Sequence, residues 1–230
     1  MPRTQDQGVL GTANGSASNL VPRSDWGANH YGNEIDGAFL NYNFISSSQG
    51  WQVTDKSGTT YYYGSNPGLF NSQQTNQYGT YKWLLDKVQD VNGNYMTVTY
   101  QTGPTDNQLY LYEIDYTGNV NSPPLSPTNS VFFDLEQTAR SDVLVSEAGY
   151  SAVTTAYRLQ AIRVYGNAQA ARKYQLNYTY SPSSSRSLLQ SVTQYGRDGT
   201  NWTDSLPPVT FAWGQRKDEG SGLEIGKIFK

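Results

Sequence analysis

Apolar and polar residues alternate along most of this chain, in short runs separated by clusters of Gly, Asn, Asp and Pro. The clearest example spans residues 81–100, where two apolar runs (82–89 and 95–100) flank the sequence DVNGN at 90–94. Asn-Gly between runs rich in β-branched and aromatic residues predicts a tight turn, because both residues tolerate the positive φ that hairpin turns require. We therefore predict a β-hairpin with strands at 82–89 and 95–100.

The same unit recurs three more times: Leu-x-x-Ile/Val, then a turn, then an alternating apolar strand. Since single hairpins are marginally stable in water, we expect the units to pair edge to edge. The prediction is an all-β fold, a degenerate series of antiparallel β-hairpins that forms one long twisted sheet, with irregular insertions at 121–129 and 136–157. The four units begin at Leu85, Leu111, Leu159 and Leu189, turn at 92–94, 117–119, 166–167 and 196–199, and end in strands at 95–100, 131–135, 174–180 and 209–213.

The first third of the chain predicts fewer elements. Residues 39–45 alternate as a half-buried strand does, and 51–53 with 59–63 predict a hairpin around the turn at 55–58. Residues 25–36 suggest an ordered loop. Residues 64–80 suggest a long polar loop, either a connector or a segment for sugar contacts.

The ends of the chain lack this pattern. We expect residues 1–24 to be a flexible N-terminal arm, 25–214 to be the β-hairpin domain, and 215–230 to be a C-terminal tail. The prolines of the hairpin region fall in the predicted connections, where a missing N–H costs no ladder bond. They are Pro123, Pro124, Pro127, Pro182, Pro207 and Pro208.

Composition and net charge exclude several classes of function. The 230 residues carry a net charge of −3 with only 15% charged residues, so no electrostatic footprint for nucleic acid or an anionic membrane is present. The absence of Cys excludes disulfides and thiolate metal sites. No apolar run approaches the roughly 20 residues of a membrane helix, and no signal peptide is visible.

No catalytic motif stands out. The single histidine, His30, lies in the predicted loop, and the nucleophile-elbow, zinc-protease and phosphate-loop motifs are absent. Carboxylate pairs remain a route to glycoside hydrolysis, but no spacing singles out a pair. We therefore predict no enzyme and assign no catalytic, cofactor-binding or metal residue. The carboxylates considered are Asp86, Asp90, Glu113, Asp115, Asp134, Glu136, Asp142 and Glu147.

Two local patterns suggest structural roles. The sequence at 90–94 is similar to the start of a calcium loop, but no Glu follows at the twelfth position, so turn chemistry explains it better. Arg140 and Asp142, two residues apart, would share one face of a strand and form structural ion pairs with neighbours. We expect Arg158 likewise to bridge to an acidic strand.

Several motifs, taken in order, resemble the SpvB-type domain over residues 20–213. That domain opens the Salmonella virulence plasmid B protein and the B components of insecticidal toxin complexes, which are relatives of the RHS/YD-repeat proteins. The motifs are Asn19-Leu20-Val21-Pro22, Trp51-x-Val53, Gly58-Thr59, Tyr63-Gly64, Trp83-Leu84, Asp90-x-Asn92-Gly93-Asn94, Tyr110-Leu111-x-x-Ile114-x-Tyr116, Arg140-x-Asp142, Arg158-Leu159-x-x-Ile162, Leu189-x-x-Val192 and Pro207-Pro208-Val209-x-Phe211.

The resemblance implies an all-β segment that builds part of a hollow β-sheet shell around a toxic cargo in larger relatives. In the virulence protein, ADP-ribosyltransferase activity belongs to a separate domain with a Glu-x-Glu motif, and no Glu-x-Glu occurs here. The glycine-rich opening, the propeller repeats and the YD-repeat region of the family are absent too. We expect a fragment or a standalone relative.

Two functions follow. The favoured one is a non-enzymatic structural or assembly module of a secreted bacterial toxin-like protein, whose partners are neighbouring β-strands of the same or a partner toxin-complex protein. The alternative is a module that binds glycans or a surface protein through exposed aromatic side chains. The aromatic candidates are Tyr61, Tyr62, Tyr63, Tyr78, Tyr81, Tyr150 and Trp202.

Overall fold

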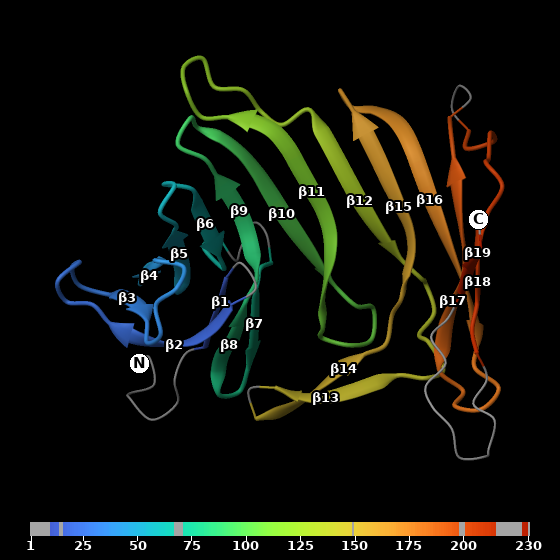
Figure 1. Cartoon of the computed structure of the whole chain (residues 1–230), viewed down its shortest axis with the longest axis horizontal. Helices are drawn as coiled ribbons and strands as arrows, with labels where there is room; N and C mark the ends of the chain where they lie inside the picture. Colours follow the sequence, from blue (N-terminus) through green and yellow to red (C-terminus); the bar gives the residue numbers. More distant parts are fainter. Residues whose placement is uncertain are drawn as a thin grey trace. The chain divides into compact units, whose positions relative to one another are not determined.

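The computed structural model describes residues 10–13, 16–66, 71–148, 150–197, 201–214 and 227–229. These residues form strands and connections with no helix, so none of them forms a helix able to cross a membrane (Figure 1). The strands are β1 Leu10–Ala13, β2 Ser16–Pro22, β3 His30–Asn33, β4 Asn41–Ile45, β5 Gly50–Thr54, β6 Thr60–Tyr63, β7 Gln73–Asn76, β8 Gly79–Trp83, β9 Leu85–Gln89, β10 Asn94–Thr102, β11 Leu109–Asn119, β12 Asn129–Leu135, β13 Leu144–Ala148, β14 Ser151–Thr155, β15 Leu159–Gly166, β16 Gln169–Tyr180, β17 Ser187–Tyr195, β18 Val209–Ala212 and β19 Lys227–Phe229.

Most strands join one sheet in the order β1-β2-β3-β4-β5-β6-β9-β10-β11-β12-β15-β16-β17-β18-β19, while β7-β8 and β13-β14 form separate two-stranded sheets. The pairings are antiparallel between chain neighbours and across the two inserted hairpins. The all-β fold of antiparallel hairpins predicted from the sequence is therefore confirmed. The chain divides into two compact units, residues 1–99 with 117–127, and residues 100–116 with 128–230.

The first unit has a small aromatic core. Leu40, Tyr42, Trp51 and Val53 are buried on β5 and on or next to β4, which pair directly. The Trp51 ring is met edge-on by the rings of Phe44, Tyr31 and Trp83, at centroid distances of 4.9, 5.5 and 6.1 Å. Such contacts add to the free energy gained by burying the rings themselves.

The central hairpin is confirmed as β9–β10, with Tyr95 opposite Gln89. Its turn places Gly93 at φ +81°. The predicted first strand, 82–89, is wrong in one respect: it breaks at Leu84, whose N–H donates to the carbonyl of Ser72 while its carbonyl accepts from Gly64. Residues before the break belong to β8.

The predicted long loop at 64–80 is also wrong, because it contains β7 and the start of β8. The fully buried Asp86 holds three residues of this stretch, Ser65, Asn66 and Ser72. This carboxylate accepts from the backbone N–H of Ser65 and Asn66 and from the hydroxyls of Ser65 and Ser72. The polar residues that suggested a loop therefore donate hydrogen bonds to the buried carboxylate of Asp86.

Other segments differ from the prediction in smaller ways. The expected loop at 25–36 contains β3, where His30 Nδ1 lies 2.8 Å from Asn41 Oδ1. The expected turn at 117–119 lies inside the end of β11. The stretch expected as a flexible arm contains β1 and β2, and β2 pairs with β3. In the stretch expected as a tail, β19 pairs with β18, and residues 215–226 lie outside the described residues.

The four predicted units are confirmed as β9–β10, β11–β12, β15–β16 and β17–β18. Three of them share a feature that we did not predict: the second residue of the Leu-x-x-Ile/Val motif is skipped in the pairing. These residues are Asp86, Gln160 and Gln190, and each coincides with a register shift. A bulge of this kind turns a side chain away from the regular alternation of the strand.

The second unit places β11, β12, β15 and β16 side by side, followed by β17 and β18 (Figure 1). Cross-strand partners show two unlike faces. One face, called here the apolar face, carries the partner rows Ile114, Val131, Val164 and Arg172; Phe133, Ile162, Tyr174 and Gln194; and Leu176, Val192 and Val209, so it is mostly apolar. The opposite, polar face carries the rows Asp134, Ala161, Gln175 and Thr193, and Asn177, Ser191 and Thr210.

Candidate functional site

The second unit has a groove of about 600 Å³ over β15–β18. Side chains of the polar face form much of its wall, together with the two bulged glutamines. Its lining is Glu136, Arg158, Gln160, Gln175, Leu176, Asn177, Tyr178, Gln190, Ser191, Pro208 and Thr210.

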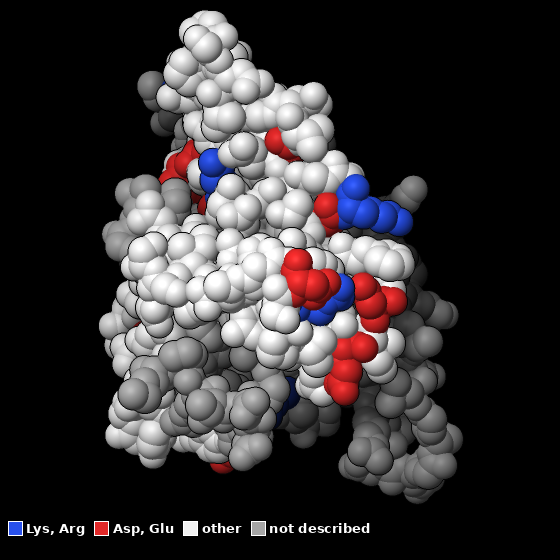
Figure 2. Space-filling view, turned by 90° about the vertical axis from the view of Figure 1, so that its left-hand side faces the viewer, with Lys and Arg blue, Asp and Glu red and all other residues white. Residues whose placement is uncertain are grey.

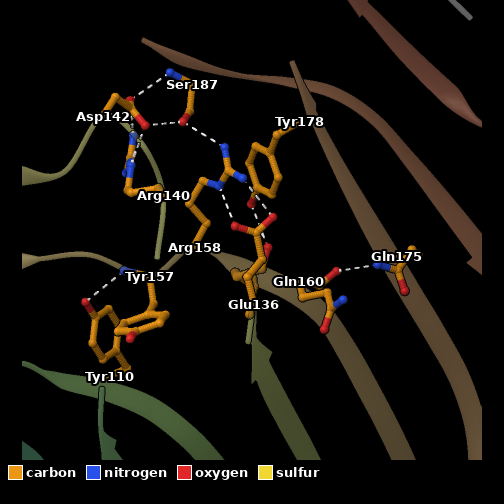
Figure 3. Close-up of polar contacts among 11 residues, drawn as sticks. Tyr110, Glu136, Arg140, Asp142, Tyr157, Arg158, Gln160, Gln175, Tyr178 and Ser187 are labelled. Atoms are coloured by element: carbon orange, nitrogen blue, oxygen red, sulfur yellow. Dashed lines mark hydrogen bonds and ion pairs between the residues drawn. The ribbon is translucent and has the colours of Figure 1, made fainter. Parts of the chain in front are cut away.

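Arg158 is the centre of the polar contacts at one end of the groove (Figure 3). Its Nε donates to Glu136 Oε2 at 2.6 Å and its Nη2 to Oε1 at 2.9 Å, while Nη1 donates to the Ser187 hydroxyl. The guanidinium carbon lies 4.5 Å from the centroid of the Tyr178 ring. The predicted bridge from Arg158 to an acidic strand is thus confirmed, because Glu136 directly follows β12.

A second ion pair adjoins the first. Arg140 donates to both oxygens of Asp142, at 2.8 and 2.6 Å, and Asp142 also accepts from the backbone N–H and the hydroxyl of Ser187 (Figure 3). These donors, led by Arg140, hold the pKa of Asp142 well below its usual range. The predicted pair is real, but it lies in the irregular segment before β13 and joins the two residues to each other, so the predicted strand position is wrong.

The segment that follows β14 is held by Asp106. Its Oδ2 accepts from the Tyr110 hydroxyl at 2.6 Å and from the N–H of Ala156 at 2.8 Å. Burial, and then the hydrogen bond to Asp106, raise the pKa of Tyr110 to about 12. The segments that enter and leave the hairpin are therefore both fixed at its base by charge-assisted hydrogen bonds.

One pair of carboxyl groups comes together on β11. Burial is the main reason that the pKa of Glu113 is raised to about 7, and the charge of Asp115 and a hydrogen bond to it add to this effect. Asp115 also accepts from the Ser130 hydroxyl. Of the carboxylates considered from the sequence, only these two form such a pair within the described residues.

The remaining sequence candidates have local roles. Asp90 accepts from the N–H of Asn92 and Asn94 and from the side-chain amide of Asn94. This is the turn chemistry that we expected in preference to a calcium loop. Asp134 is paired with Arg163 at 2.6 Å, and Glu147 is exposed on β13.

The aromatic residues considered for recognition do not gather at the groove, whose only aromatic lining residue is Tyr178. Five of them belong to the first unit and two to the second. The groove glutamines were missed at the sequence level. The sequence did contain a signal for them: the third and fourth units both begin with Leu-Gln, at 159–160 and 189–190.

Comparison with known proteins identifies the family of this chain. The family model described as the Salmonella virulence plasmid 65kDa B protein, SpvB, matches residues 5–228. The chain belongs to the SpvB family. No curated protein matches it.

Solved structures show the same fold as this SpvB-family chain at low sequence identity. The N-terminal domain of the effector protein SpvB from Salmonella typhimurium strain LT2 is 13% identical, with a TM-score of 0.60 over 83% of this chain and 75% of that one. The TcdB2-TccC3-TEV structure (15%, TM-score 0.58) and a Photorhabdus luminescens Tc holotoxin pore (16%, TM-score 0.57) are each matched over 91% of this chain. The chain spans 12% of the length of those two.

Proposed function

We propose that this chain is a non-enzymatic structural module of a secreted bacterial toxin-like protein, and that it forms one section of a β-sheet wall around a cargo polypeptide. The observation that carries the proposal is the half-exposed apolar face of the second unit. Across β12, β15, β16 and β17, Ala161 alone is buried, and it lies on the polar face.

The apolar face therefore lacks a second layer among the described residues. A sheet normally buries its apolar face against a helix layer or another sheet. Val131, Phe133, Ile162, Val164 and Val192 are instead all half-buried. Further β-sheet from a toxin-like assembly would complete their burial, at about 25 cal/mol for each Å² removed from water.

The engagement of the carboxylates supports a non-enzymatic role. Asp86, Asp90, Asp134, Glu136 and Asp142 each accept hydrogen bonds from neighbouring groups of their own unit. Residues used in this way stabilise the fold. Glu113 and Asp115 form a carboxyl pair. If the chain hydrolysed any of a panel of glycosides and Glu113→Gln abolished that activity, this part of the proposal would be contradicted.

The relatives supply the toxin context. One structural neighbour is an effector protein and another a toxin pore, which supports secretion of this chain with toxin-like proteins as partners. Figure 2 shows few charged side chains on one face, with both signs mixed.

The test uses the purified chain and light scattering across a concentration series. We expect association that grows with concentration and is lost in Val164→Lys, which places a charge on the apolar face. Thr193→Lys, on the polar face, is the matched control and should associate like the unmodified chain. A monomer at every concentration that also fails to bind a hydrophobic dye would overturn the proposal.

A further inference from the structure

The groove over β15–β18 has features of a binding site that a wall section does not require. Gln160 and Gln190 hold equivalent positions in two units, both are skipped in the strand pairing, and both line the groove. Both side chains are exposed. Bulges are over-represented next to functional sites because they redirect a side chain without disrupting the rest of the strand.

The groove is also electrically balanced. Its cation, Arg158, is neutralised by Glu136 through two hydrogen bonds. The other lining residues are amides, hydroxyl-bearing residues and two aliphatic ones. A charged ligand would therefore lose hydration without gaining an opposite charge, so the groove favours a neutral ligand.

The hydrogen-bonding groups suit hydroxyl groups. An amide side chain presents one acceptor and two donor hydrogens, and a hydroxyl both donates and accepts. Gln175 donates to the backbone carbonyl oxygen of Gln160, and Asn177 donates to the Ser191 hydroxyl (Figure 3 shows the first contact). The side chains of Gln175 and Asn177 are thus held in place by their amide nitrogens, which leaves their amide oxygens as acceptors. Neighbouring hydroxyls of a sugar ring match such paired donors and acceptors.

An extended peptide fits less well. It would bind a sheet through backbone hydrogen bonds at an edge, but the groove lies over the face of β15–β18, whose strands already pair with one another. We propose that this groove binds a neutral oligosaccharide, with Gln160 and Gln190 as the principal hydrogen-bonding side chains. This inference goes beyond the proposed wall function and does not depend on it.

One face of the Tyr178 ring is covered by the Arg158 guanidinium, so a sugar ring cannot stack on that face. Binding is therefore expected to be weak and to rely on hydrogen bonds. Nuclear magnetic resonance titration of the full chain suits weak binding, and the pattern of shifted amide signals locates the ligand without any variant. The probes are maltohexaose, cellohexaose and chitohexaose, with a sialylated oligosaccharide and a neutral Ser/Gly peptide as comparisons.

We expect a neutral hexasaccharide to shift the signals of β15–β18, and the double variant Gln160→Ala/Gln190→Ala to weaken that binding about tenfold or more. Gln77→Ala, an exposed glutamine in the first unit, is the matched control and should bind normally. Binding by the peptide or the sialylated probe alone, shifts confined to other strands, or no shift with any probe would each overturn the inference.

Discussion

Arg158 and Glu136 form a two-point ion pair at the end of the groove, with side chains that are 13% and 21% exposed. Removing one partner leaves the other charge largely desolvated. We expect Glu136→Gln to lower the free energy of unfolding by about 2 kcal/mol, measured by urea denaturation.

Asp25→Asn provides the control for this prediction. It breaks the Arg23–Asp25 pair, whose side chains are 35% and 61% exposed. Water and salt screen an exposed pair, so we expect a smaller loss than in Glu136→Gln. Equal losses in the two variants would show that burial of the Arg158–Glu136 pair has no energetic consequence.

Asp86 anchors the segment before β7 through four donors and is fully buried. In Asp86→Asn, an amide group with two donor hydrogens replaces one acceptor oxygen and faces existing donors. We expect a loss of about 2 kcal/mol in the free energy of unfolding, followed by denaturation, and faster amide exchange at Ser65 and Asn66.

Asp90→Asn is the comparison, because Asn also supports this type of turn. Its effect on the free energy of unfolding should be smaller than that of Asp86→Asn. If exchange at Ser65 and Asn66 in Asp86→Asn matched that of the unmodified chain, the carboxylate would not be what orders this segment.

Gly93 adopts φ +81° in the turn of the central hairpin, and a Cβ there would lie about 3.0 Å from Asn121 and Val120 atoms. Gly93→Val therefore combines backbone strain with a close contact. We expect a loss of about 1 kcal/mol or more in the free energy of unfolding. Gly37→Val is the control, since a Cβ at Gly37 meets nothing within 4 Å; an unchanged unfolding midpoint in Gly93→Val would contradict the turn geometry.

Local patterns sufficed to predict the four repeated hairpins. Asn92-Gly93 specified its turn, and the alternation in 95–100 and 174–180 specified strands, because both signals act between near neighbours in sequence. The family resemblance was likewise visible in the order of short motifs, and the family match confirms it.

The groove could not be predicted from local sequence patterns, because its residues come together only in the folded sheet. Glu136, Arg158 and Ser187 meet only after β12, β15 and β17 have paired, and their separations in sequence carry no signal for that contact. The β7–β8 hairpin was missed because its Gln and Asn residues have low strand propensity, which tertiary hydrogen bonds to Asp86 and Leu84 override.

Glu113 makes stability depend on pH. Its pKa is raised from 4.5 to about 7 in the folded chain, first by burial and then by Asp115. The folded state therefore binds more protons than the unfolded state between these values, so the stability from this group is present at low pH and lost as pH rises through about 7.

Glu113→Gln removes the charge, and after allowance for solvent screening we expect it to raise the free energy of unfolding by about 1 kcal/mol at about pH 8 and to change it little at about pH 4. Urea denaturation at both pH values measures this difference. A Glu113→Gln profile parallel to that of the unmodified chain would mean that Glu113 is already charged near pH 5.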